Sequence, residues 1–236
     1  SIKNFKSFYK TIKKYKHIKL DALSVHIGSQ ILSDVPYKKM LNVMSNLIRE
    51  LQLDLKFLDL GGGFGISYNK KDKPIDLKKY SESVYKLAKK LKCKIIFEPG
   101  RSIIGDTGVL LSKIQYIKKG VKKDFVIIDA GMNDFMRPAL YDAVHKIIPT
   151  KKSNSKLKGV IEFVGPICES TCKFGSYKNY QKMNENDFVA ITNVGAYGSS
   201  LSSNYNSRPL IAELLVNRNK LKYIRKKQDL LKLINS

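Results

Sequence analysis

The stretches LSVHIGSQ (residues 23–30), FLDLGGGFG (57–65) and IIFEPGR (95–101) decide the fold of this chain. Each is an apolar run that ends in small or polar residues, and the intervals from His26 to Gly61 and from Gly61 to Glu98 are 35 and 37 residues. That spacing is about the length of one strand–helix–strand unit. Parallel α/β folds collect ligand contacts at the carboxyl ends of such strands. The three stretches therefore predict a site for a cofactor that carries a phosphate and a ring.

Amphipathic patterns surround these strands. Apolar residues at helical spacing predict helices over 2–16, 36–51 and from Asp76 to about Leu91. The strands themselves are expected over 21–27, 56–60 and 94–97. A closed eight-stranded barrel takes about 250 residues. We therefore expect residues 1–106 to be the C-terminal part of a TIM-type (β/α)8 barrel whose earlier strands lie outside this chain.

The texture of the sequence changes after Gly105, and a boundary is expected near residues 102–108. Short β-branched and aromatic runs, separated by Gly, Asn and Lys turns, predict a mainly antiparallel β domain over 107–236. The expected strands are 108–118, 125–129, 160–164, 187–192, 210–216 and 221–224. The fold class is α/β plus β.

Composition argues against two other classes, nucleic-acid-binding proteins and membrane-spanning proteins. A net charge of +24 could indicate nucleic-acid binding, but only six of the 44 basic residues are Arg and the Lys are spread along the whole chain. A solvated surface explains this pattern better. No apolar run reaches 18 residues, so no membrane span is expected. Three cysteines without paired spacing (Cys93, Cys168 and Cys172) favour a reduced compartment, the cytoplasm.

The third stretch, IIFEPGR (95–101), gives the most specific chemical prediction. A carboxylate at Glu98 that faces a pyridine nitrogen would keep the nitrogen protonated and so make the ring an electron sink. Gly100 and Arg101 follow it as candidate anion donors. A plain surface pair between Glu98 and Arg101 is the competing interpretation.

The other two stretches suit the same cofactor. Gly62 and Gly63 follow a strand, where the lack of a Cβ lets backbone N–H groups approach a phosphate. His26 could stack on a flat ring, and Ser29 could donate to a phosphate. A tight glycine turn and a packed core histidine are the plainer alternatives.

Polar clusters in the β domain lie on bends. Arg137 and Tyr141 are four residues apart, so both can face one side of a turn or short helix and hold a carboxylate. Cys168 and Glu169 lie in one Gly-flanked bend and Tyr197 in another. Taken singly, each bend is explained as well by a structural turn.

The motifs carry more weight together than singly. They are HIGSQ (26–30), LDLGGGFGI (58–66), EPGRSI (98–103), DAGMNDFMRPALYDAVH (129–145), VGPICES (164–170) and GAYGSSLSSNYNSRP (195–209). In this order they resemble the diaminopimelate decarboxylases, a branch of the barrel-type pyridoxal-phosphate (PLP) decarboxylases related to alanine racemase and ornithine decarboxylase. The cofactor motifs are shared across that class, whereas the Arg-Pro-Ala-Leu-Tyr and Cys-Glu-Ser runs point to the diaminopimelate branch.

The resemblance implies PLP as the cofactor, no metal, and decarboxylation of meso-2,6-diaminopimelate to L-lysine and CO2, the last step of lysine biosynthesis. It implies a homodimer with shared active sites, in which Cys168 and Glu169 come from the partner subunit. His26 and Cys168 would be catalytic. The implied cofactor-binding residues are His26, Ser29, Gly62, Gly63, Glu98, Gly100, Arg101 and Tyr197. The implied substrate-binding residues are Arg101, Arg137, Tyr141, Glu169 and Tyr197.

The chain departs from the family pattern in two places. Cys172 stands where the family usually has an acidic residue. The family's Schiff-base lysine lies on an early barrel strand in an Ala-x-Lys-Ala-Asn-like motif, and none of the 38 lysines here has that context. Two alternatives stay open: a decarboxylase of another basic amino acid such as arginine or ornithine, and an inactive truncated product or basic anion-binding module.

The charge interpretation is testable. If the lysine excess is only solvated surface, binding to duplex DNA should be weak, independent of sequence and lost steeply as salt rises, because counterion release drives it. Fluorescence anisotropy with two unrelated duplexes over a salt series measures this. A complex specific for one sequence that survives about 200 mM salt would contradict the interpretation.

Overall fold

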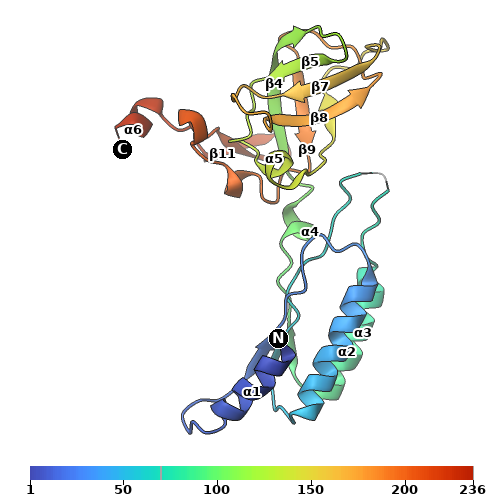
Figure 1. The fold of residues 1–236 in the computed structure, drawn as a ribbon, viewed down its shortest axis with the longest axis vertical. Helices are drawn as coiled ribbons and strands as arrows, with labels where there is room; N and C mark the ends of the chain where they lie inside the picture. Colours follow the sequence, from blue (N-terminus) through green and yellow to red (C-terminus); the bar gives the residue numbers. More distant parts are fainter. Residues whose placement is uncertain (70, 236) are drawn as a thin grey trace. The chain divides into compact units, whose positions relative to one another are not determined.

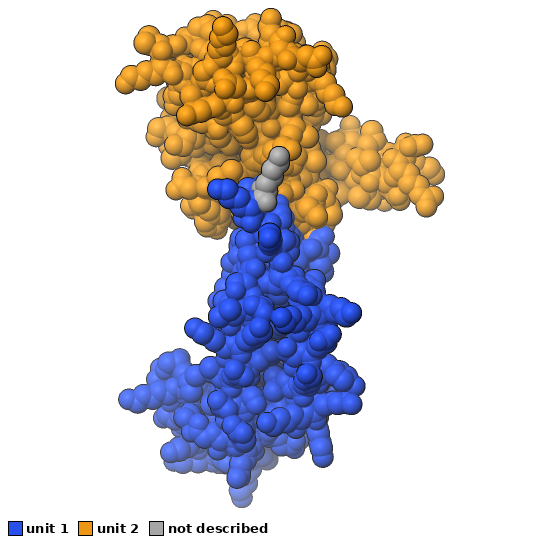
Figure 2. Space-filling view, turned by 90° about the vertical axis from the view of Figure 1, so that its right-hand side faces the viewer, with its two compact units in different colours: residues 1–103 blue, residues 104–236 orange. Residues whose placement is uncertain are grey.

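The structure is a computed structural model that describes residues 1–69 and 71–235 of the 236-residue chain. The chain divides into two compact units, residues 1–103 and 104–236 (Figure 2). The division expected after residue 106 falls just inside the second unit.

The first unit is built on a parallel sheet. Its elements are α1 (Ile2–Ile12), β1 (Ala22–Ser24), α2 (Asp34–Glu50), β2 (Phe57–Asp59), α3 (Leu77–Leu91) and β3 (Lys94–Ile96). The strands run parallel in the order β1-β2-β3, with Leu23 opposite Leu58 and Leu58 opposite Ile95. The expected register of the three deciding stretches is therefore confirmed.

Local chemistry fixes the two long helices of this unit. The Ser33 hydroxyl accepts from the Val35 N–H at 3.3 Å and caps α2, and the Asp76 carboxylate accepts from the Lys79 N–H at 3.1 Å and caps α3. The two helices lie side by side (Figure 1). Their apolar faces join the strands in one core: Leu23, Tyr37, Met40, Leu41, Met44, Ile48, Leu55, Leu58, Leu60, Phe64, Ile75, Tyr80, Val84 and Leu87.

The first helix is shorter than expected. It ends at Ile12, not at residue 16, and none of its residues is buried. Only Phe5 packs against the core, while Phe8 on the helix and Tyr15 beyond it are each 58% exposed. Because packing of the apolar face supplies most of a helix's stability in a protein, the weakly packed C-terminal turn is lost.

Within the part of the chain that the structure describes, β3 forms one of the two outer edges of the parallel sheet. β3 pairs with β2 alone among the described residues, and both Ile96 and Phe97 are about two-fifths exposed (41% and 42%). A largely apolar groove of about 510 Å³ lies between α3 and this strand, lined by Ser81, Glu82, Val84, Tyr85, Ala88, Ile95 and Phe97. Strands of a parallel sheet are normally covered by helices or by further strands. Among the described residues, β3 has no strand on its outer side.

A six-stranded sheet forms the centre of the second unit. The elements from the junction onward are α4 (Arg101–Ile104), β4 (Val109–Lys118), β5 (Asp124–Ile128), α5 (Arg137–Tyr141), β6 (Ile147–Pro149), β7 (Val160–Val164), β8 (Lys173–Lys178) and β9 (Phe188–Thr192). The strand order is β6-β9-β4-β5-β7-β8, and all pairs are antiparallel except β5 with β7 (Figure 1). The mainly antiparallel domain is confirmed.

The remaining elements follow this sheet. They are two short 3-10 helices, η1 (Ser199–Leu201) and η2 (Tyr205–Ser207), the hairpin of β10 (Glu213–Asn217) and β11 (Lys220–Arg225), and α6 (Leu230–Ile234). The sequence did not predict β6, β8, α4 or α6. β6 is three residues long and ends in Pro149, and β8 (KFGSYK) has Gly175 in its middle and few apolar residues, so neither gives a clear strand pattern. No helix in residues 1–69 and 71–235 is long and apolar enough to cross a bilayer.

The first unit's core yields a stability prediction. The fully buried Tyr37 hydroxyl donates to the Gly62 carbonyl at 3.1 Å, and burial raises the pKa of Tyr37 to about 12. Tyr37→Phe should lower the free energy of unfolding by about 1 kcal/mol, because the carbonyl loses its partner. Denaturant titration measures this, with Tyr85→Phe on the exposed face of α3 as the matched control.

The same raised pKa sets an alkaline limit. The folded state holds the neutral phenol, so its contribution to stability is complete below the unfolded pKa near 10 and is lost as pH rises toward about 12. Wild type should therefore lose more stability between about pH 9 and 11 than Tyr37→Phe does. Equal losses in the two proteins would show that Tyr37 does not govern this limit.

Candidate active site

The first half of the candidate site lies at the carboxyl ends of β1, β2 and β3. Backbone hydrogen bonds continue the ladder beyond the strands: the Leu60 N–H donates to the Ile96 carbonyl at 3.0 Å, and the Glu98 N–H donates to the Gly61 carbonyl at 2.8 Å. The Gly62 N–H lies 3.5 Å from His26 Nδ1. The structure thus brings the three strand ends together, with the side chains of His26 and Glu98 exposed.

The glycines after β2 are required by the chain itself. A Cβ at Gly62 would overlap the Glu98 carbonyl, and one at Gly63, whose φ is +88°, would overlap the Gly28 carbonyl. Close approach of neighbouring segments therefore explains these glycines without a ligand. Gly100 differs, because no atom lies within 4 Å of where its Cβ would be.

Arg101 gathers the polar groups of this half. Its Nη1 donates to the Tyr68 hydroxyl at 2.5 Å and its Nη2 to the Ser29 hydroxyl at 3.2 Å, although Ser29 lies 72 residues earlier. A guanidinium and two hydroxyls beside the open space at Gly100 are donors that suit a phosphate monoester. The residues present therefore fit the phosphate of the expected cofactor.

Gln30, which sequence reasoning assigned no role, holds this half in shape. Its side-chain amide donates to the Ile66 carbonyl at 2.7 Å and accepts from the Ile66 N–H at 3.2 Å. The amide thus pairs with a backbone group as a neighbouring strand would. Gln30 ends the HIGSQ motif and has a left-handed backbone (φ 57°), a signal that only the structure reveals.

The second half of the candidate site is in the β unit, where α5 carries Arg137 and Tyr141. Arg137 is only 6% exposed, and its Nη1 lies 2.9 Å from Nε2 of the buried His145. Tyr141, one turn further along, is 61% exposed. The short helix that the sequence allowed is present, but its two polar residues have different environments.

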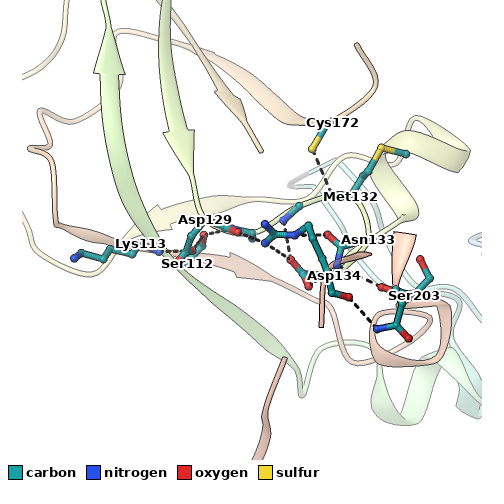
Figure 3. A network of polar contacts seen from close by, with 12 residues as sticks. Ser112, Lys113, Asp129, Met132, Asn133, Asp134, Cys172 and Ser203 are labelled. Atoms are coloured by element: carbon teal, nitrogen blue, oxygen red, sulfur yellow. Dashed lines mark hydrogen bonds and ion pairs between the residues drawn. The ribbon is translucent and has the colours of Figure 1, made fainter. Parts of the chain in front are cut away.

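A buried polar network fixes the loop before α5 (Figure 3). Asp134 accepts from the Gly131 N–H at 2.8 Å and from the Asn133 amide at 3.0 Å. Arg208 donates to the Asn133 side chain at 3.0 Å and to the Asp129 carbonyl at 2.8 Å, and its guanidinium lies 3.6 Å from Asp134. Burial raises the pKa of Asp134, while the Gly131 N–H and Arg208 oppose that rise.

The network connects the bends that carry the other expected residues. Arg208 follows η2, and Tyr205 within η2 donates its hydroxyl to the Glu169 carboxylate, a hydrogen bond that raises the pKa of Tyr205. Cys168, beside Glu169, is an exposed free thiol. The Arg137 loop, the Glu169 bend and η2 are therefore tied together by side-chain contacts.

Tyr197 stands out for its backbone. Its φ of +58° lies in the left-handed region, and its side chain is 45% exposed. A non-glycine residue in this region costs about 1 kcal/mol or more, and such strain is concentrated at functional sites. The flanking Gly195 and Gly198 are needed because a Cβ at either would overlap a backbone carbonyl, of Ile104 or Val194.

Cys172 occupies a confined position. It is 3% exposed, its Sγ accepts from the Met132 N–H at 3.4 Å, and a Cβ on Gly165 would reach that Sγ at 2.5 Å. The Cys172 side chain thus fills the space beside Gly165 and Met132. The surrounding bend stays closed through the Gly165 N–H, which donates to the Cys172 carbonyl at 2.8 Å.

The expected site residues divide between the two units. The first unit holds His26, Ser29, Gly62, Gly63, Glu98, Gly100 and Arg101, and the second holds Arg137, Tyr141, Cys168, Glu169 and Tyr197. His145, Tyr205 and Arg208 were missed as site residues. All three lie inside the quoted motifs, but their hydrogen bonds to distant segments, to Arg137, Glu169 and Asn133, cannot be inferred from sequence position.

Known proteins are similar to this chain in sequence and in fold. Residues 18–195 match the family model described as pyridoxal-dependent decarboxylase, C-terminal sheet domain. Diaminopimelate decarboxylase of Aquifex aeolicus is 38% identical over 94% of this chain and 53% of its own length, and that of Helicobacter pylori is 42% identical over 89% and 53%. The crystal structure of the Helicobacter pylori enzyme complexed with L-lysine superposes with a TM-score of 0.89 at 37% identity, covering all of this chain and 59% of that one.

The chain spans about half the length of the curated relatives it matches. The match to the family model covers most of its residues and includes the strand ends, the Arg137 loop and the Glu169 bend. This chain belongs to the pyridoxal-dependent decarboxylase family.

Proposed function

We propose that this chain is the C-terminal part of a decarboxylase that converts meso-2,6-diaminopimelate to L-lysine and CO2. The observation that carries the proposal is the buried guanidinium of Arg137 on α5. A buried cation is costly unless it meets polar or anionic partners. Diaminopimelate carries a second carboxylate at its distal end, whereas the distal groups of ornithine and arginine are cations that Arg137 would repel.

The first unit supplies the cofactor half. Arg101 and Ser29 would hold the PLP phosphate beside Gly62, Gly63 and Gly100, which is consistent with the donors gathered there. Glu98 would accept a hydrogen bond from the protonated ring nitrogen, and His26 would cover a ring face. When bound, PLP supplies an electron sink for the carbon that loses CO2.

The second unit supplies the substrate half. Arg137 and Tyr141, helped by Arg101, would bind the distal carboxylate, and Glu169, contributed across the homodimer proposed below, would face the distal ammonium. Tyr205 orients the Glu169 carboxylate through its hydroxyl, which donates a hydrogen bond to a carboxylate oxygen. Tyr197 would contact both cofactor and substrate.

The assembly is also proposed. Exposure of Cys168 and Glu169 in a single chain suits residues that complete a neighbouring subunit's site in a homodimer. A cytoplasmic location agrees with three free cysteines.

This chain alone should not decarboxylate diaminopimelate. The reaction needs a lysine positioned to bond the cofactor's aldehyde carbon. None of the 38 lysines of this sequence lies in the motif that would supply it. Borohydride reduction after mixing with PLP, followed by peptide mass analysis, should give scattered substoichiometric labelling and no lysine product. One stoichiometric pyridoxyl-lysine together with turnover would contradict this.

Substrate choice tests the proposal directly, in a complete enzyme made by joining this chain to the N-terminal half of the Aquifex aeolicus relative. Arg137→Ala should lower kcat/KM for diaminopimelate at least about tenfold, since a charge-assisted hydrogen bond contributes roughly 1.5–3 kcal/mol and 1.36 kcal/mol is tenfold in rate. PLP absorbance and affinity should stay near wild type.

Two comparisons make that result specific. Arg49→Ala, an exposed arginine on α2, is the matched control and should change neither property. Glu98→Ala should cripple turnover and leave substrate preference unchanged, because it acts on the ring. Normal diaminopimelate turnover by Arg137→Ala, or activity on ornithine or arginine in the parent, would show that the substrate assignment is wrong.

A further inference from the structure

A buried histidine, His145, contacts the Arg137 guanidinium. His145 is 1% exposed and its ring bridges two elements. Its Nε2 lies 2.9 Å from Nη1 of Arg137 on α5, and its Nδ1 lies 2.9 Å from the backbone carbonyl oxygen of Thr192 at the end of β9. His145 has no place in the reaction as proposed above.

The chemistry of these two partners determines the proton position on the ring. Arginine offers only N–H donors, so Nε2 has to present its lone pair to Arg137. A backbone carbonyl can only accept, so Nδ1 has to carry the proton that is donated to Thr192. Only the neutral tautomer with its proton on Nδ1 satisfies both contacts.

We infer that His145, neutral and protonated on Nδ1, is a positioning residue that fixes the Arg137 guanidinium for the substrate's distal carboxylate. The inference rests on the proposed function for its carboxylate, but the tautomer and the pairing rest on geometry alone. A guanidinium held at one Nη by a rigid acceptor loses rotational freedom before the ligand arrives, and such preorganisation raises affinity.

The surroundings make the acceptor rigid. The ring of Phe135 meets the imidazole edge to face, with centroids 4.6 Å apart at 85°. The Tyr177 hydroxyl of β8 donates to the His145 backbone carbonyl at 3.1 Å and accepts from the Ile147 N–H at 2.9 Å. Both the ring and the backbone of His145 are thus held from separate elements.

The charged and titratable groups that face His145 favour its neutral form. Arg137 on α5 is a cation, and Tyr177 on β8 meets the backbone and not the ring, with a pKa that burial raises further above neutrality. Phe135 and Thr192, from the loop before α5 and from β9, carry no charge. A proton on Nε2 would place two N–H groups and two positive charges against one another.

Acid pH should therefore lower the contribution of this pair to the stability of the fold. The unfolded chain takes up a proton on this histidine near pH 6.5, whereas the folded pair excludes it. Stability from the pair is complete above that pH and is lost as pH falls below it, because the unfolded state then binds more protons.

The tautomer can be observed in this 236-residue chain. It has only three histidines, and the other two, His17 and His26, are exposed. Long-range ¹H–¹⁵N NMR, assigned with His145→Gln, should show one ring as the Nδ1–H neutral tautomer at about pH 6. A charged His145 or an Nε2–H tautomer under those conditions overturns the inference.

The positioning role has its own readout in the joined enzyme. His145→Ala should raise KM for diaminopimelate about tenfold with kcat within about threefold, because a positioned charge-assisted contact to the substrate is weakened. His145→Gln, which keeps one uncharged acceptor and one donor, should restore KM and remove the fall in melting temperature between about pH 7 and 5.5. His17→Gln is the matched control and should behave as wild type.

These experiments distinguish a failure of the positioning role of His145 from a failure of the proposed function. An Ala variant with unchanged KM, or a Gln variant with the acid loss intact, overturns the positioning role. If His145→Ala does not fold, the Gln variant and the wild-type spectrum still decide. A joined enzyme without preference for diaminopimelate overturns the proposed function and leaves the pairing to be judged by the NMR spectrum.

Discussion

The parallel register of β1, β2 and β3 is the constraint on which the candidate site in the first unit depends. One residue of slip would turn every side chain to the opposite face. The hydrogen bonds from Leu60 to Ile96 and from Glu98 to Gly61 extend that register past the last strand residues, so the bends themselves are aligned. Polar groups more than 70 residues apart, such as Ser29 and Arg101, meet only because of this alignment.

The second unit buries charged side chains. Asp134 and Arg137 are both almost completely buried. Asp134 meets the Gly131 N–H and the Arg208 guanidinium, and Arg137 meets the His145 imidazole. Buried ionic groups contribute little net stability but penalise alternative arrangements strongly when a partner is lost. The loop before α5 is thereby held in one conformation.

Much of this was predictable from the sequence. Periodicity located the two long helices and the three parallel strands, because their apolar patterns match their burial. It failed for α1, whose pattern continues past Ile12 without a surface to pack on, and for β6 and β8, where pairing partners and not local residues decide the structure. Motifs named the site residues, but the hydrogen bonds of His145, Gln30 and Arg208 depend on contacts between distant segments that no local pattern encodes.

The outer edge of the sheet at β3 gives the lysine-rich composition a meaning beyond solvation. An uncovered strand beside an apolar groove is a template for edge-to-edge association. With +24 net charges, two copies of the chain repel one another before such edges can meet, and Lys94 places one of those charges on the strand itself. The repulsion is screened beyond about 8 Å at physiological ionic strength. The colloidal state of the free chain is thus governed by its counterions as much as by its fold.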